Sequence, residues 1–371
     1  MVFPTLTGRP SPPPDPFEPL PLPSLLLRAP VKLLLSKLYA LLSALRSTPT
    51  PHDPPIRIVC LSDTHTHTLC PGDVPLGDVL VHAGDLSDRG SVAEIQAQVD
   101  WLAGLPHREV VVVAGNHDRW LDPRTRGGLA EGREGREAKV EWGRVHYLQH
   151  RRVSLSIPVG EARTWQRQDA ADSPQTPEPE PEPEPEPTSR THLLARRTTS
   201  RRIRIYGAPQ IPACGPMSEH AFQYPRGRDA WSETVPDDVD VLVTHTPPKF
   251  HLDLPLPDGL GCEHLMREVR RVKPALHVFG HVHWGAGKAT VWWDGAHDAY
   301  ETAMGVRSKW TRGLLNPWLW WNVVRVGYRG LRELIWDKIW GGQGPNTIMV
   351  NAAQMHGNTG KLGNRVQVVD I

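Results

Sequence analysis

Short apolar runs separated by polar loops recur along the middle of the chain. Residues 56–61, 79–83 and 110–114 are three such runs, and each has the length and composition of a buried strand. Between the second and third runs, Ser91 and Glu94 have the spacing of a capping box, and apolar residues follow at helical spacing. Strand, polar loop, helix and strand in this order predict an α/β fold.

The same pattern resumes after an interruption. Short strands are predicted within 142–157, a helix at 263–272, and strands at 203–206, 239–243, 275–279, 347–351 and 366–370. The interruption, at about 163–200, includes a strict Pro-Glu alternation that has no apolar area to bury. We therefore expect a disordered acidic insertion in a loop of one folded domain that spans 56–371.

Two other segments depart from this pattern: a Pro-rich N-terminal extension, 1–55, and a Trp-rich insertion at about 303–344. Within them, residues 25–46 and 310–340 combine apolar bulk with Lys or Arg. Neither contains an uncharged run long enough to span a bilayer. Two interpretations stay open, namely peripheral contact with a membrane through amphipathic helices and packing of both segments on the domain.

The net charge limits the classes of binding partner that we expect, and the cysteine content indicates the cellular location. The formal net charge is +1, and no basic run is interleaved with aromatic residues, so we expect no nucleic-acid polymer as partner. The cysteines lack a Cys-x-x-Cys spacing, which argues against a disulfide framework and a thiolate zinc site. Reduced thiols predict a cytoplasmic protein. The open membrane interpretation of residues 25–46 and 310–340 would place it peripherally on a membrane. The cysteines are Cys60, Cys70, Cys214 and Cys262.

Residues of the metal-ligand type follow the ends of five predicted strands. An α/β sheet gathers its binding site at the carboxyl ends of its strands. Imidazole nitrogens mixed with carboxylates suit Mn, Fe or Zn better than Ca or Mg. The residues are Asp63 and His65, Asp85, Asn116 and His117, His245, and His281 and His283.

The motifs around these residues carry a family resemblance. DTH, GDLSDRG, GNHD, THTPP and GHVH occur in this order within about residues 56–290, and as a set they resemble the calcineurin-like metallophosphoesterases. The stretches SDTH, YGAPQIP and VNAA resemble, more closely, the branch of metallophosphoesterase-domain-containing proteins. Trp284 stands where that branch is expected to have an acidic residue, a departure that bears on substrate specificity.

The resemblance implies a four-layer αββα sandwich with two mixed β-sheets flanked by helices and a site for two divalent metal ions, Mn, Fe or Zn. By analogy with the family, Asp85 bridges the two ions. His117 is expected to act as hydrogen-bond donor or general acid, oriented by Asp88. Arg89 is expected either to contact phosphate or to form a structural ion pair. One metal would be held by Asp63, His65, Asp85 and His283, and the other by Asp85, Asn116, His245 and His281.

The function implied by the resemblance is that of a dimetal-dependent phosphohydrolase. We expect a phosphodiesterase that hydrolyses a small phosphate ester, such as a cyclic nucleotide, through a metal-bridging hydroxide. One alternative keeps this chemistry but acts on a lipid-linked phosphate at a membrane surface. A second alternative, from a different class, is a non-catalytic membrane-associated scaffold on the same fold.

Overall fold

The computed structural model describes residues 18–127, 138–159, 199–215, 218–254, 258–306 and 314–371. The predicted acidic insertion therefore lies outside the described residues, apart from its last two positions. Residues 307–313 of the predicted Trp-rich insertion also lie outside them.

The first sheet is built mainly from the amino-terminal apolar runs. Its strand order is β13-β1-β2-β3-β4. Neighbouring strands from β1 to β4 are parallel, and β13 pairs antiparallel with β1 at the edge. The strands are β1 (Arg57–Leu61), β2 (Val79–His82), β3 (Glu109–Val112), β4 (Val145–Tyr147) and β13 (Gln367–Asp370).

The second sheet has the order β11-β12-β10-β9-β6-β5. Its central strands β6, β9, β10 and β12 are parallel, whereas β5 and β11 pair antiparallel at the two edges. Val159 and Thr199 are partners in the β5–β6 register, so the connection between β5 and β6, in which the acidic insertion was predicted, starts and ends at one edge of this sheet. The strands are β5 (Arg151–Val159), β6 (Thr199–Ala208), β9 (Val241–Thr244), β10 (Leu276–Phe279), β11 (Gly287–Trp292) and β12 (Asn346–Asn351).

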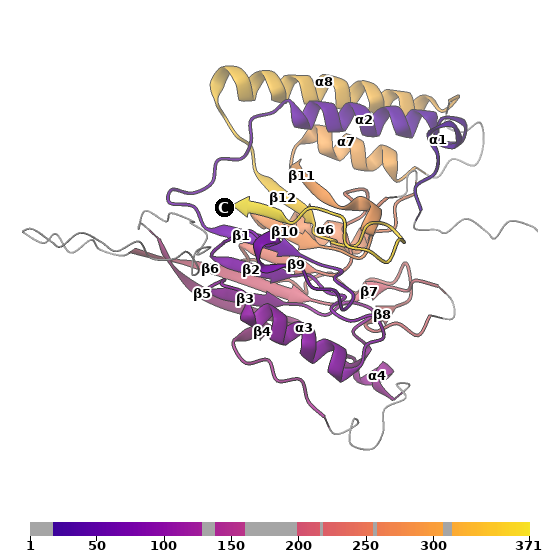
Figure 1. The fold of residues 1–371 in the computed structure, drawn as a ribbon. Helices are drawn as coiled ribbons and strands as arrows, with labels where there is room; N and C mark the ends of the chain where they lie inside the picture. Colours follow the sequence, from indigo (N-terminus) through magenta and orange to yellow (C-terminus); the bar gives the residue numbers. More distant parts are fainter. Residues whose placement is uncertain (1–17, 128–137, 160–198, 216–217, 255–257, 307–313) are drawn as a thin grey trace, which may run out of the picture.

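The two sheets pack face to face, and one helix covers each outer face. Ile58 and Val81 of the first sheet share a buried core with Ile205 and Val278 of the second. Helix α3 (Val92–Gly104), with its Ser91–Glu94 capping box, packs on the outside of the first sheet. Helix α6 (Glu263–Val272) packs on the outside of the second. The predicted αββα sandwich is confirmed (Figure 1).

A further helical layer lies beyond the second sheet. It contains α1 (Leu22–Arg28), α2 (Pro30–Ala44), α7 (Gly295–Met304) and α8 (Pro317–Trp340), with α2 and α8 side by side (Figure 1). Helix α2 buries Leu35 against α7 and α8, and the Lys32 ammonium donates to the Met304 carbonyl at 2.7 Å. The apolar segment that precedes the domain and the Trp-rich insertion within it therefore pack on one another.

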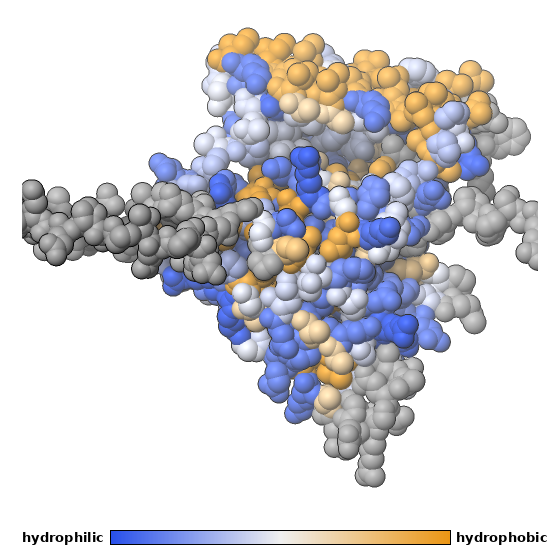
Figure 2. All heavy atoms as spheres, in the orientation of Figure 1, coloured by the Kyte–Doolittle hydropathy of each residue, from blue (hydrophilic) through white to orange (hydrophobic). Residues whose placement is uncertain are grey.

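Packing does not hide all of their apolar side chains. Figure 2 shows hydrophobic residues gathered along the outside of α8 and its neighbours. Every large hydrophobic residue that is exposed within the described ranges lies in α1, α2, α8 or the residues next to them. We call this surface the apolar face. It consists of Leu22, Leu26, Leu27, Leu34, Leu41, Leu45, Leu314, Leu315, Trp318, Trp320, Trp321, Val324, Tyr328, Leu331, Ile335, Trp336, Ile339 and Trp340.

Candidate metal centre

The five predicted strand ends meet at one edge of the sandwich. Strands β1, β2 and β3 of the first sheet are followed by Asp63, Asp85 and Asn116, and β9 and β10 of the second sheet are followed by His245 and His281. Hydrogen bonds join the two sets. The Asp63 carboxylate accepts from the His281 backbone amide at 3.0 Å, and His245 Nδ1 donates to the Ala83 carbonyl at 2.9 Å.

The backbone turns sharply where these side chains enter the site. Asp63, His65, Asp85 and His281 all have left-handed φ values, of 53°, 44°, 55° and 67°. Non-glycine residues rarely adopt such values, and they concentrate where a site demands a particular side-chain direction. Gly280 allows the two sheets to approach, because a Cβ on it would lie 2.0 Å from Asp63 Oδ2.

One group of ligand atoms comes from Asp63, His65 and His283, whose ligand atoms lie within 4.8 Å of one another. His283 Nδ1 donates to the Gly357 carbonyl at 2.8 Å, and its Nε2 lies 3.3 Å from Asp63 Oδ1. His65 is buried, yet neither of its ring nitrogens has a hydrogen-bond partner. A buried imidazole without partners is costly unless another group binds it.

A second group comes from Asp85, His245 and His281. His245 Nε2 lies 3.3 Å from Asp85 Oδ2 and 2.9 Å from Asn116 Oδ1. Because Nδ1 already carries the hydrogen donated to Ala83, neutral His245 presents a lone pair to these two oxygens. Three acceptor atoms that face one another require a proton or a metal ion between them.

Asp85 lies between the two groups. Its Oδ2 is 3.7 Å from His65 Nε2 on one side and 3.3 Å from His245 Nε2 on the other. Its Oδ1 accepts from the His117 backbone amide at 2.8 Å, which fixes the carboxylate in the space between them. The position fits the bridging role that the family resemblance implies.

In this site, burial and neighbouring charges shift the pKa values of several ligand residues in opposite directions. Burial alone would lower the pKa of His245, but the Asp85 carboxylate beside it raises that pKa to about 9. Burial disfavours the charged forms of Asp63 and Asp85, yet the neighbouring imidazoles lower the pKa of both carboxyls. Burial also lowers the pKa of His281 to about 3. Ionised carboxylates and neutral imidazoles are the forms in which these residues bind metals.

The donor set fits divalent metal ions. Both buried ring nitrogens of His65 lack a hydrogen-bond partner, and acceptor atoms face one another around His245. The mixture of imidazole and carboxylate ligands suits Mn, Fe or Zn. All seven residues predicted as ligands are within the site. They are Asp63, His65, Asp85, Asn116, His245, His281 and His283.

His117 lies beside the ligands and is oriented in an unexpected way. Its Nδ1 bonds to the backbone carbonyl of Asp88 at 2.7 Å. The expected contact between Asp88 and this ring is thus made by the backbone carbonyl of Asp88, whereas its carboxylate is largely exposed and lies 3.9 Å from His65 Nδ1. The loop turns its main chain toward His117 and its side chain away from it.

Arg89 is exposed at the same loop. Its backbone amide, at 3.1 Å from Glu94 Oε2, makes the contact that holds the loop to α3. The structure thus places the guanidinium at the surface beside the site, and its role stays a prediction.

The sequence did not reveal two further residues of the site. The His220 ring lies 4.7 Å from the His117 ring, and Cys214 Sγ lies 3.8 Å from His281 Nε2. Both belong to the stretch around the short strands β7 (Ile211–Pro212) and β8 (Gln223–Tyr224). The sequence signals near them are the YGAPQIP motif, which ends two residues before Cys214, and the AF…RG…W stretch, which begins directly after His220.

Trp284, the departure from the family pattern, packs near a ligand. A Cβ on Gly357 would lie 2.5 Å from the Trp284 ring, so the indole fills the space beside Gly357. The Gly357 carbonyl is the group that accepts from His283 Nδ1. Trp284 therefore supports the orientation of His283.

Another cluster of ligand-type residues lies outside this centre, and an arginine of the chain already binds it. His251, His297 and Glu301 lie close together, but Arg270 donates to His297 Nδ1 at 2.9 Å and pairs with Glu301. An arginine inside the cluster supplies the positive charge that a metal would bring. We interpret this group as structural.

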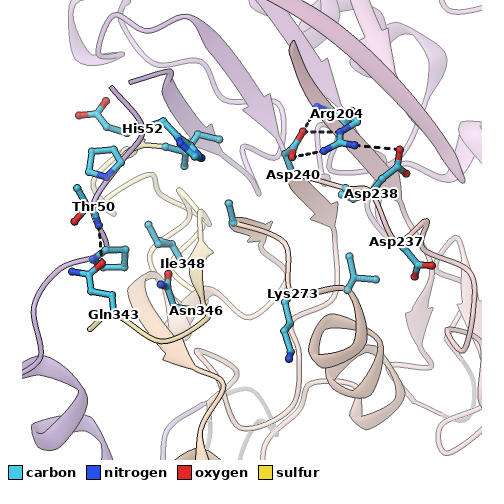
Figure 3. A pocket seen from close by; sticks show the side chains of 17 residues that line it. Thr50, His52, Arg204, Asp237, Asp238, Asp240, Lys273, Gln343, Asn346 and Ile348 are labelled. Atoms are coloured by element: carbon cyan, nitrogen blue, oxygen red, sulfur yellow. Dashed lines mark hydrogen bonds and ion pairs between the residues drawn. The ribbon is translucent and has the colours of Figure 1, made fainter. Parts of the chain in front are cut away.

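The pocket in Figure 3, with a volume of about 460 Å³, lies at the opposite edge of the second sheet from the metal ligands. It is lined by residues that precede β9, β10 and β12 rather than by residues that follow them. Its acidic residues Asp238 and Asp240 are paired with Arg204, at 3.4 and 3.0 Å. Among the described residues, the histidine and aspartates that line it do not come together as a group of three possible ligands.

Comparison with known proteins bears on this site. Residues 56–168 match the sequence profile of the family described as calcineurin-like phosphoesterase. Metallophosphoesterase domain-containing protein 1 of Homo sapiens is 33% identical over 251 residues, which cover 64% of this chain and 65% of that protein. A UPF0046 protein of Caenorhabditis elegans is 30% identical over 246 residues, which cover 63% of this chain and 71% of that protein.

Another similar protein is much longer. The probable rhamnogalacturonate lyase C of Emericella nidulans is 33% identical over 317 residues, which cover 85% of this chain but only 24% of that protein. This chain thus spans about a quarter of that relative and about 65% of the human one. Among solved structures, the protein TT1561 of Thermus thermophilus has a TM-score of 0.36 and 14% identity, covering 64% of this chain and 84% of that one.

Proposed function

Because the chain belongs to the calcineurin-like phosphoesterase family, we propose that it is a dimetal-dependent hydrolase of small phosphate esters. The family expected from the motifs is confirmed. The observation that carries the proposal is the position of Asp85, whose carboxylate lies between two groups of buried ligand atoms.

The residues of the site divide into two ligand sets with Asp85 shared. We propose that Asp63, His65 and His283 complete one set, and Asn116, His245 and His281 the other. When bound, two such ions polarise a phosphoryl oxygen and lower the pKa of water. Asp85 reduces the repulsion between the two positive charges, and hydrogen bonds to the carbonyls of Gly357 and Ala83 hold the rings of His283 and His245 in place.

His117 is placed to act on the leaving group. The Asp88 carbonyl fixes one ring nitrogen, so the other is free for substrate. Burial opposes protonation, but the nearby Asp85 carboxylate raises the pKa of His117. A protonated imidazole next to a dimetal site can give its proton to the departing ester oxygen. His220, whose ring packs beside that of His117, is placed to contact the same side of the substrate.

We propose a phosphodiester, such as a cyclic nucleotide, as the substrate. A cyclic diester carries one negative charge, less than a dianionic monoester does. When water adds to phosphorus and the P–O bond to one sugar oxygen breaks, that oxygen leaves as an alkoxide tethered to the product, and His117 is placed to give it a proton. The test is turnover of purified protein with Mn²⁺ on 2′,3′-cyclic nucleotides, 3′,5′-cyclic nucleotides and the matching monoesters. We expect at least one cyclic class to be preferred over the monoesters. A preference for monoesters in every pair would contradict the diester assignment.

A second candidate substrate is a lipid-linked phosphate, favoured by the apolar face on α1, α2 and α8. A purely non-catalytic scaffold is disfavoured because it would have no need of a complete ligand set. The lyase name of the Emericella nidulans protein is not carried over, since this chain corresponds to 24% of it. We also propose a cytoplasmic location, supported by four cysteines that are all unpaired.

A further inference from the structure

Helix α8 is apolar on two opposite sides. Its inner side packs on the rest of the chain, because Leu319 and Val326 are buried against α2 and α7. On its outer side, Trp321, Val324 and Tyr328 are 55%, 59% and 70% exposed. A helix that is hydrophobic all round is normally covered on every side. Packing within the chain therefore explains one side of α8 and leaves the other unexplained.

The apolar surface continues from α8 onto α2 and α1. Gly330 of α8 lets α2 approach closely, because a Cβ on it would lie 2.7 Å from Leu42 Cδ1. Leu34 and Leu41 of α2 are exposed on the outside of the same layer, as Figure 2 shows for the helices at the top of the view. A 24-residue helix is about 36 Å long. Single exposed apolar residues are common on protein surfaces, but a continuous apolar surface of this length marks an interaction site.

The charges on these helices are mostly of one sign. Arg28, Lys37, Arg332 and Lys338 are exposed, whereas α1 and α2 contain no acidic residue. In α8, Glu333 is paired with Arg332, and Asp337 is buried and accepts from the Ser47 amide at 2.6 Å. Arg332 thus has an acidic partner, whereas the exposed basic residues Arg28, Lys37 and Lys338 have none on these three helices.

This charge pattern separates two possible occupants. In a symmetric dimer through the apolar face, basic residues would face basic residues, with only Glu333 to offset them. An anionic lipid surface supplies the missing negative charge and accepts the apolar side chains. Tryptophans near both ends of α8, such as Trp318 and Trp340, are typical of the membrane–water interface. No helix within the described ranges is long and apolar enough to cross a membrane.

We propose that the apolar face binds peripherally to anionic membranes, with α8 lying in the plane of the interface. This inference goes beyond the proposed hydrolase function and does not depend on it. Lipid contact would bury the outer side of α8 and of α2 while leaving the αββα sandwich unchanged.

The test is co-sedimentation of the full chain with vesicles of phosphatidylcholine alone or mixed with phosphatidylserine. We expect binding to the mixed vesicles at low salt, weaker binding at high salt, and little binding to phosphatidylcholine alone. The double variant Val324→Glu/Leu331→Glu should lower affinity about tenfold or more, because it places two carboxylates at the lipid contact. The control Ala93→Glu/Ala97→Glu makes the same charge change at exposed positions of α3 and should bind like wild type.

Several results would overturn the proposal. One is a full chain that stays in the supernatant with anionic vesicles at low salt. Another is equal loss of binding in the α3 control, which would make net charge the cause. A third is a wild-type dimer that dissociates in Val324→Glu/Leu331→Glu, since a second copy would then cover the face. Circular dichroism and melting temperature confirm that both variants fold.

Discussion

At the scale of single residues, the centre is defined by which atom of each side chain is left for a ligand. His283 and His245 each use Nδ1 on a backbone carbonyl, so that Nε2 faces the site. His117 uses Nδ1 on the Asp88 carbonyl in the same way, and we propose that its other nitrogen faces substrate. One hydrogen bond per ring thus decides its orientation.

The role given to His117 is tested by removing its imidazole. His117→Ala should leave two metals bound and lower kcat by about 10²–10⁴-fold, because only proton transfer is lost. Metal content by elemental analysis and kcat on a cyclic nucleotide, whose alkoxide leaving group needs a proton, are measured on the same preparation. Loss of one metal would show that His117 is a ligand, an outcome that its closeness to His65 and Asp85 makes worth checking.

Metal affinity should depend on pH through His245. Burial opposes protonation, but Asp85 raises the pKa of this imidazole to about 9 in the metal-free protein. Below that pH a metal must displace the proton, so affinity should rise as pH increases, by up to about tenfold per unit, and level off above about 9. Competition with a chromophoric chelator between about pH 7 and 9 measures this. Affinity that stays flat or falls over that range would contradict the assignment.

At the scale of elements, the ligands could be predicted because each follows an apolar strand. Asp63 and Asp85 stand directly after runs whose burial pattern is continuous, and parallel strands must end at a common edge. His220 and Cys214 could not be found this way. They flank strands of only two residues, β7 and β8, which have no periodicity to read. A motif likewise does not show whether a turn presents its side chain or its main chain, and Asp88 contacts His117 through its backbone carbonyl.

The flanking helices show another limit of sequence patterns. Leucine dominates 25–46, and tryptophan and leucine are frequent in α8, so the pattern predicted packing on the domain or membrane contact as alternatives. The structure shows packing and, in addition, an exposed apolar face. A helix that is apolar on two sides leaves no sequence signal for which side turns inward.

The packing of α2 is tested by a pair of neighbouring leucines. Leu35 is fully buried against α7 and α8, whereas Leu34 is 45% exposed. Leu35→Ala should lower the free energy of unfolding by about 2–5 kcal/mol through lost burial and a cavity. The control Leu34→Ala should cost about 0.5 kcal/mol or less. Urea denaturation measures both, and equal effects would mean that α2 does not pack as described.

At the scale of the whole molecule, the sandwich brings two separate sheets to one edge, and the centre exists only where they meet. Asp63 and Asp85 come from the first sheet, whereas His245 and His281 come from the second. The apolar face lies on a different layer, formed by α1, α2 and α8, which packs on α7 beyond the second sheet. Hydrolysis and lipid contact are therefore assigned to separate parts of the chain and can be tested separately.

The central claim is that Asp85 is shared by two metal ions at a phosphoesterase site. The most direct measurement is Mn²⁺-dependent hydrolysis of bis-p-nitrophenyl phosphate by wild type and Asp85→Asn, with bound metal counted in each. We predict that wild type binds two metals, loses turnover with chelator and regains it with Mn²⁺. Asp85→Asn should lose nearly all turnover and hold both metals more weakly. Wild-type turnover and two tightly bound metals in Asp85→Asn would contradict the account.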